Sequence, residues 1–178
     1  MSDRWLIPIS HLITEQSKEE KLLNLTAYHE AGHAVMARFL GGRVTWVTLE
    51  PEFESGKYGI TQVVWPSDWF ETKTGCEQAA MVALAGPAAE MIHLGEPFHP
   101  ATVVEWSEDW RQADEALRSW IKQEPARFVA LEHIARLVVN HFYQDSVWAA
   151  VAALADELDA HETLEQEAIE EVLNVWME

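Results

Sequence analysis

The sequence predicts a mainly α-helical domain with a small β-sheet, which places the chain in the α+β class. Long stretches have apolar residues at helical spacing, whereas only two segments show the β-branched alternation that is typical of strands. At 178 residues, 48% of them hydrophobic, the chain has the length of one domain and enough apolar side chains for a buried core. We expect one long helix, an antiparallel strand pair and then a helical C-terminal bundle.

The first predicted helix covers residues 17–39. Ser17 and Glu20 have the spacing of a capping box, and a pair of glycines after the last apolar position supplies a stop signal. Strands are predicted over residues 44–49 and 58–65, because both are rich in β-branched residues and both precede a proline. The two strands should pair antiparallel, and a third short strand could join them.

The remainder of the chain is predicted to be helical. Thr74 and Glu77 form a second capping box, which starts a helix that runs to Leu94. Pro87 lies inside this helix and should kink it or split it in two. Four more helices are predicted: residues 108–122 with Ser107 as N-cap, residues 125–143, one capped by Asp145 or Ser146, and a last one opened by Thr163 and Gln166.

The composition argues against several classes of partner and of location. The formal net charge of -18 disfavours nucleic acid and anionic membrane surfaces, because both would repel the chain. Cys76 is the only cysteine, so no intrachain disulfide is possible, and its apolar neighbours indicate a small core or near-surface residue and not a nucleophile. No apolar segment is long enough to span a bilayer and no secretory signal begins the sequence, so a cytoplasmic location is expected.

The string HEAGH at residues 29–33 is the most informative feature of the sequence. Residues four apart lie on the same face of a helix, so His29 and His33 can direct two imidazoles at one metal ion. Glu30 can reach a water on that metal without ligating it. Two nitrogen ligands, an open coordination position and a nearby base are the requirements of zinc-assisted hydrolysis, although two histidines can also share a helix face by chance.

A catalytic zinc usually has three protein ligands, and the segment after His33 contains no further ligand type. The third ligand must therefore come from elsewhere in the chain. A carboxylate at a helix start is attractive because the preceding loop can bring it to the metal, but most acids at helix starts act as caps. Spacing leaves six candidates open, namely Glu90, His93, His99, Glu105, Glu108 and Asp109.

Several segments resemble the peptidase domain of the FtsH-type zinc metalloproteases, the proteolytic parts of membrane-anchored AAA proteases. Residues 26–35 (TAYHEAGHAV) carry the most specific likeness. Residues 44–51 are similar to the family's V-x-x-V-T-I-x-P strand, residues 59–66 to the strand beside its cleft, and residues 83–90 to its L-x-G-R-x-A-E-E helix. Residues 105–109 (EWSED) fall where the family has G-A-S-N-D, whose aspartate is the third zinc ligand.

The resemblance implies a zincin-like fold around Zn²⁺ held by His29, His33 and Asp109, with Glu30 as the catalytic base. It implies a metalloendopeptidase that acts on a peptide or unfolded protein, aligned as an added strand beside residues 59–65. The peptidase-like domain would span residues 17–178. Residues 1–16 would form an N-terminal extension in which we find no interpretable motif.

The sequence also departs from the family. It lacks a Walker A pattern, and its length leaves no room for an ATPase module, so we expect a peptidase that is independent of ATP as a lone chain. The alternative is a zinc-containing binding or regulatory domain that cleaves nothing, or one that acts only with a partner ATPase in trans. The apolar C-terminal helices could form a homo-oligomer. Four tryptophans could line or fill the cleft: Trp65, Trp69, Trp106 and Trp110.

Overall fold

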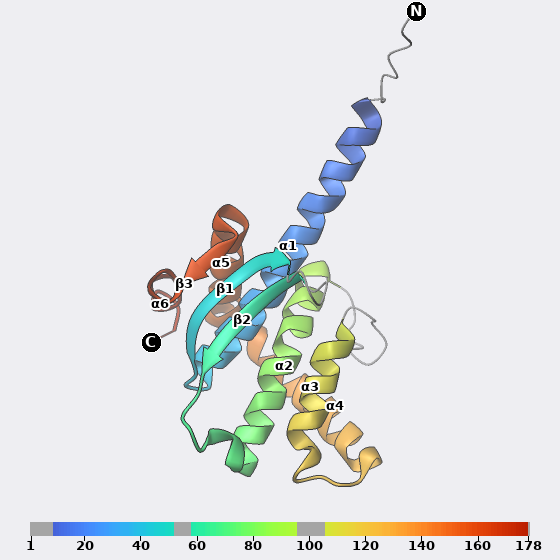
Figure 1. Ribbon diagram of the computed structural model, residues 1–178, viewed down its shortest axis with the longest axis vertical. Coiled ribbons are helices and arrows are strands. Elements are labelled where there is room, and N and C mark those ends of the chain that lie inside the picture. The colour runs from blue at the N-terminus through green and yellow to red at the C-terminus, as the bar shows by residue number, and fades with distance from the viewer. Residues whose placement is uncertain (1–8, 52–57, 96–105, 178) are drawn as a thin grey trace, which may run out of the picture.

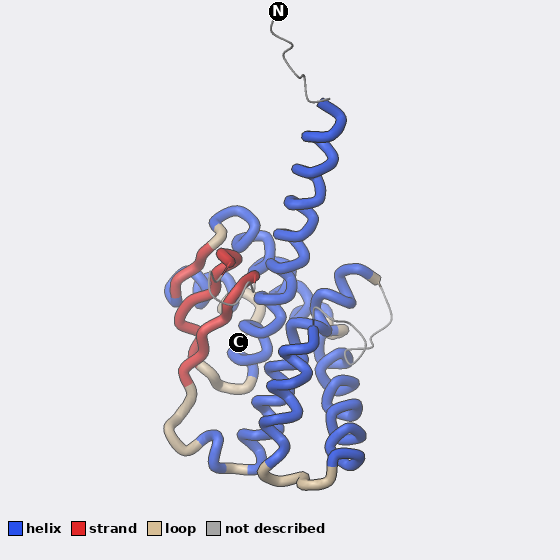
Figure 2. Tube along the Cα trace, turned by 45° about the vertical axis from the view of Figure 1, so that its right-hand side comes forward, coloured by secondary structure: helices blue, strands red, loops and turns tan. Residues whose placement is uncertain are grey.

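The computed structural model describes residues 9–51, 58–95 and 106–177, and it confirms a mainly α-helical fold with a small antiparallel sheet (Figure 1). The strands gather on one side and helices form the rest (Figure 2). None of the described helices is long and apolar enough to cross a membrane. The elements are α1 (Ile9–Phe39), β1 (Arg43–Pro51), β2 (Tyr58–Val64), the 3₁₀ helix η1 (Trp69–Glu71), α2 (Lys73–Leu94), α3 (Ser107–Arg118), α4 (Glu124–Phe142), α5 (Asp145–His161), β3 (Thr163–Glu165) and α6 (Gln166–Leu173).

Helix α1 begins earlier than predicted, at Ile9, and its first turns project beyond the rest of the fold (Figure 1). The predicted N-cap at Ser17 is therefore wrong. Residues 9–16 contain neither glycine nor proline, and a serine inside a helix costs less than about 1 kcal/mol. The helix ends as predicted at two glycines, with Gly41 in the left-handed region at φ 87°. Residues 1–8 of the predicted extension lie outside the described residues, and the domain boundary at residue 17 stays a prediction.

The sheet has the order β2-β1-β3, with both pairs antiparallel. The Thr163 hydroxyl lies 2.6 Å from that of Thr48, so Thr163 pairs in β3 and does not cap a helix as predicted. Val47 is the buried centre of β1 and pairs with Thr61 on one side and Leu164 on the other. Among the described strands β2 is an edge, and it runs alongside the second half of α1 (Figure 1).

Helices α1 and α2 approach each other closely because small residues meet at their contact. A Cβ on Gly32 would lie 2.5 Å from the backbone oxygen of Ala85 and 2.7 Å from Cβ of Ala89. Both alanines are fully buried. This close approach brings the turns of α1 that carry His29 and His33 against α2. Polar groups of α2 can therefore reach the two imidazoles.

Helix α2 is continuous, so the predicted break at Pro87 does not occur. A proline inside a helix costs about 3 kcal/mol, and burial of its neighbours against α1 offsets that loss. The helix also starts earlier than predicted: Thr72, and not Thr74, is the N-cap, and its hydroxyl accepts from the Gly75 N–H at 2.9 Å. Of the two predicted positions for Cys76, core or near the surface, the structure shows the buried one, and Sγ donates to the Phe70 carbonyl at 3.3 Å.

The C-terminal helices follow the predicted order with shifted ends. The N-caps of α3 and α5 are Trp106 and Gln144, each one residue before a predicted cap. Helix α4 lies within one residue of its predicted bounds, with a proline in its first turn. Helix α3 ends at Arg118, four residues before the predicted residue 122.

The buried Arg127 explains the early end of α3. Its Nη1 donates to the carbonyls of Ile121 and Lys122, both at 3.1 Å, so these carbonyls serve the turn between α3 and α4. Its Nε donates to Oδ1 of Asp114 at 2.7 Å. Hydrogen bonds from Arg127, and then from Arg118, hold the pKa of the Asp114 carboxyl below its usual value. One guanidinium thus joins α4 to the middle and the end of α3.

We expect Arg127→Met to lower the free energy of unfolding by about 1–3 kcal/mol, because it leaves the Ile121 and Lys122 carbonyls without their donor and removes one of the two guanidinium partners of Asp114. Urea denaturation at pH 7 measures the change, with the exposed Arg136→Met as control. A lowered carboxyl pKa contributes stability that is present above the unfolded value of about 3.9 and is lost as the pH falls through the folded value. The difference between Arg127→Met and wild type should therefore shrink below about pH 4. Equal free energies of unfolding for Arg127→Met and Arg136→Met at pH 7 would contradict the role of Arg127.

Candidate metal centre

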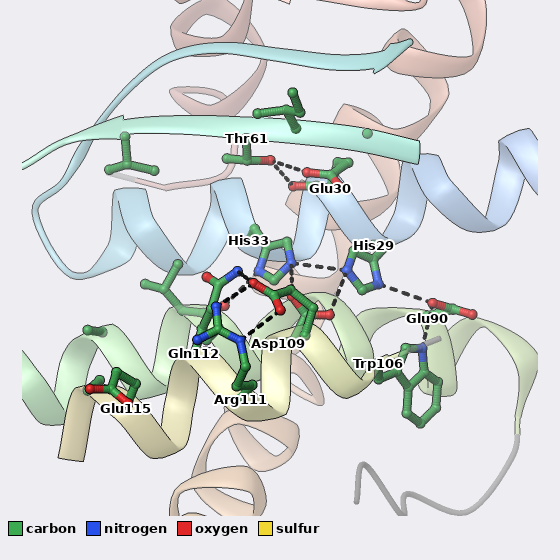
Figure 3. Close-up of a pocket in the computed structure, with 18 of the residues that line it drawn as sticks. His29, Glu30, His33, Thr61, Glu90, Trp106, Asp109, Arg111, Gln112 and Glu115 are labelled. Carbon is green, nitrogen blue, oxygen red and sulfur yellow. Dashed lines mark hydrogen bonds and ion pairs between the residues drawn. The ribbon is translucent and has the colours of Figure 1, made fainter. Parts of the chain in front are cut away.

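A cleft of about 1150 Å³ contains the predicted site residues and is lined by α1, β2, α2 and α3 (Figure 3). His29 and His33 point from α1 toward Asp109, which lies in the first turn of α3. One nitrogen or oxygen atom from each of these three residues lies within 4.8 Å of the other two. The fold thus brings Asp109 to two histidines that lie at least 76 positions before it in the sequence.

The ligand-type atoms converge on one point. Nε2 of His29 and Nε2 of His33 are 3.1 Å apart. Oδ2 of Asp109 lies 3.3 Å from the first nitrogen, and Oδ1 of the same carboxylate lies 3.6 Å from the second. Two nitrogens and a carboxylate in this arrangement form a donor set of the kind that holds a catalytic zinc.

The other nitrogen of each imidazole is held by a partner on α2. Nδ1 of His33 donates to the Val82 carbonyl at 2.7 Å, because a carbonyl can only accept. Nδ1 of His29 lies 3.1 Å from Oε2 of Glu90. Hydrogen bonds of this kind fix the tautomer, so that each Nε2 presents a lone pair to the shared point. A cation at that point would satisfy all three groups.

The electrostatics of the site also favour a cation. Burial alone would lower the pKa of His29, but hydrogen bonds to the Asp109 and Glu90 carboxylates outweigh it and raise the pKa to about 10. The charge of Glu30 acts in the same direction. The pocket therefore stabilises positive charge at this imidazole, and a proton and a metal ion would compete for the same place.

Glu30 is buried, and strand β2 holds its carboxylate. The Thr61 hydroxyl donates to Oε2 of Glu30 at 2.7 Å and also lies 3.1 Å from the Glu30 carbonyl oxygen (Figure 3). A Cβ on Gly59 would lie 2.5 Å from Oε1 of Glu30, and Gly59 has φ 83°. Only glycine combines that backbone angle with so close an approach. The strand and the helix thus fix the predicted base beside the histidine pair.

The six candidates for the third ligand separate clearly. Asp109 reaches both imidazoles, whereas Glu90 holds the outer nitrogen of His29. Glu108 lines the cleft and pairs with Arg111 at 2.7 Å. His93 is exposed, and its ring stacks on that of Tyr28 with 3.7 Å between the ring centroids. The remaining two, His99 and Glu105, lie outside the described residues.

Sequence reasoning missed the outer partners of the site. Thr61 and Trp106 lie in segments that resemble the family, but nothing in the sequence assigned their side chains to Glu30 and Glu90, and Val82 lies just before the segment at residues 83–90. The one signal for Glu90 was chemical, because metal-binding histidines commonly give their second nitrogen to a carboxylate.

The tryptophans play different roles around the cleft. Trp106 is 5% exposed and therefore fills space beside His29. The rings of Trp65 and Trp69 stack at 3.7 Å, and together with the exposed Phe70 they line an apolar part of the cleft. Trp110 contacts Phe128 of α4 and does not line the cleft.

Comparison with known proteins gives matches over the part of the chain that carries this site. The model of peptidase family M41 matches residues 14–123, more than half of the chain, and this range includes every residue of the converging set. The ATP-dependent zinc metalloprotease FtsH 1 of Alkaliphilus metalliredigens (strain QYMF) is 37% identical over 101 residues, which cover 56% of this chain and 16% of that protein. FtsH 2 of the same organism is 40% identical over 78 residues, which cover 42% of this chain and 11% of that protein. The matched segments thus span less than a fifth of the length of each of these relatives. Because the family model covers more than half of the sequence, the chain belongs to peptidase family M41.

Proposed function

We propose that this chain is a zinc-dependent metallopeptidase in which His29, His33 and Asp109 hold the metal and Glu30 acts as base. The convergence of two imidazole nitrogens and a carboxylate within 4.8 Å carries this proposal. Membership of a peptidase family and the zinc metalloprotease names of two relatives support it. The donor set of two histidines and one carboxylate matches catalytic zinc sites that keep a position open.

When bound, zinc supplies Lewis-acid activation of water and of the scissile carbonyl. The buried Glu30 carboxylate accepts the proton of the attacking water and later gives it to the leaving amine. Thr61 holds this carboxylate in place by its hydroxyl, so that one oxygen stays free for the proton. Glu90 and the Val82 carbonyl keep the two imidazoles in the orientation that binding requires.

The substrate in this proposal is an extended peptide or an unfolded protein. Strand β2 has no neighbour on its outer side among the described strands, and its residues line the cleft. A peptide can add to such an edge as a further strand, which aligns one peptide bond with the metal by main-chain hydrogen bonds. The apolar wall at Trp65 and Trp69 favours peptides with large apolar side chains beyond that bond. Both relatives are named ATP-dependent, so we also propose that a partner ATPase unfolds folded proteins and delivers the extended chain to this cleft.

Metal analysis and a chelator test this function directly. We expect one zinc per chain, measured by mass spectrometry of the metal, and cleavage of unfolded casein that a chelator abolishes and added zinc restores. Cleavage that survives complete removal of the metal would contradict the proposal. Stoichiometric zinc without cleavage of casein or of a peptide library would favour the alternative, a binding domain that keeps the peptidase fold.

A further inference from the structure

Trp106 connects two parts of the site that the mechanism treats separately. Its indole N–H donates to Oε2 of Glu90 at 2.8 Å. The same oxygen lies 3.1 Å from Nδ1 of His29, so one carboxylate oxygen serves both rings (Figure 3). Only 5% of Trp106 is exposed, and the hydrogen bond is therefore shielded from water.

This contact restricts the Glu90 side chain. A carboxylate on a free side chain rotates among several rotamers, and ordering it has an entropic cost. The N–H of Trp106 holds the same oxygen of Glu90 that contacts His29. Hydrogen bonds to a charged acceptor are among the stronger ones in proteins, so this contact holds the oxygen that orients the imidazole.

The position of Trp106 in the chain adds a second link. Trp106 is the N-cap residue of α3, and Asp109 follows in the first turn of that helix. The buried indole therefore attaches to α2 the same turn that carries the third metal-binding group. Through Glu90 it contacts the partner of His29, and through its own helix it places Asp109. If Glu90 or the first turn of α3 were displaced, His29 and Asp109 would no longer converge on one point.

We propose that Trp106 is a positioning residue that pre-assembles the metal centre, by holding Glu90 against His29 and the first turn of α3 against α2. The inference rests on the proposed zinc site and goes beyond it. Pre-assembly raises metal affinity because the ordering of His29 and Asp109 does not have to occur on binding.

The experiment compares Trp106→Phe with Trp110→Phe, a matched substitution one turn further along α3, where the ring contacts Phe128. Zinc affinity is measured by competition with a chromophoric chelator. We expect Trp106→Phe to weaken zinc binding about tenfold, as is usual for an outer partner of a metal ligand, and Trp110→Phe to leave it unchanged. Bound Co²⁺ should show an altered visible absorption spectrum in Trp106→Phe alone. The melting temperature of each metal-free variant separates a loss of fold from a loss of site.

A double-mutant cycle tests whether Trp106 acts through Glu90. In a Glu90→Ala background, Trp106→Phe should add little further loss, because the two effects share one contact. Wild-type zinc affinity in Trp106→Phe, or equal weakening in both tryptophan variants, would overturn the inference and leave the proposed function standing. A wild-type chain that binds no zinc would overturn both. Should Trp106→Phe fail to fold, zinc titration of the wild-type chain decides, since the indole N–H resonance of Trp106 should shift and that of the exposed Trp120 should not.

Discussion

Glu30→Gln is expected to abolish peptide hydrolysis while zinc stays bound. A glutamine amide cannot take up the proton of the attacking water, and general-base catalysis contributes about 10²- to 10⁴-fold to a rate. The substitution preserves the volume of the side chain, and its amide oxygen can still accept from Thr61, which now donates to Oε2 at 2.7 Å. The three metal-binding side chains are untouched. The loss should therefore fall on kcat and not on metal content.

The measurement is kcat/KM for an unstructured peptide, with zinc content determined on the same preparations. Glu132→Gln, an exposed glutamate on α4, has the same change of charge and serves as control. It should leave the rate unchanged and show that the loss is specific to the glutamate at position 30. Glu30→Gln with a rate within tenfold of wild type would remove Glu30 from the role of base, and a variant devoid of zinc would place Glu30 in the binding of the metal.

Local patterns were sufficient to predict the part of the site that lies within one helix. His29, Glu30 and His33 lie on two successive turns of α1, and their spacing alone gives the shared direction of the imidazoles. Asp109 required the resemblance to a family, because its approach depends on how α3 packs against α2. The Val82 carbonyl had no signal in the sequence at all, since every residue has one and tertiary packing decides which carbonyl an imidazole meets.

Helix ends were predicted less well than helices, for a physical reason. Ser17 with Glu20 has the letters of a capping box, but the chain before it continues the helix, and the serine has no free N–H to cap. Thr163 has the same pattern, yet its hydroxyl meets Thr48 across a strand pair. A capping side chain is one of several uses of a short hydroxyl group, and the neighbouring backbone decides among them.

Gly86→Ala should remove zinc from the site. A Cβ at this position would lie 2.4 Å from Nε2 of His33 and 2.7 Å from Nε2 of His29. Zinc binds imidazole nitrogen at about 2.0–2.1 Å, so the new methyl group and the ion would compete for the same space. We expect zinc affinity to fall by at least about 100-fold, the upper end of the loss for an altered outer partner.

Gly32→Ala provides the contrast that separates this effect from unfolding. Both glycines lie inside helices, where alanine is intrinsically favoured by about 1 kcal/mol. A Cβ on Gly32, however, meets the Ala85 backbone oxygen at 2.5 Å and would push α1 away from α2, so the melting temperature should fall. The nearest atoms to a Cβ on Gly86 belong to imidazole side chains and not to the backbone of α1, so the metal-free form of Gly86→Ala should stay folded by circular dichroism. If Gly86→Ala retained wild-type zinc affinity, the ion could not lie between the two imidazoles and α2, and the converging nitrogens would need another explanation.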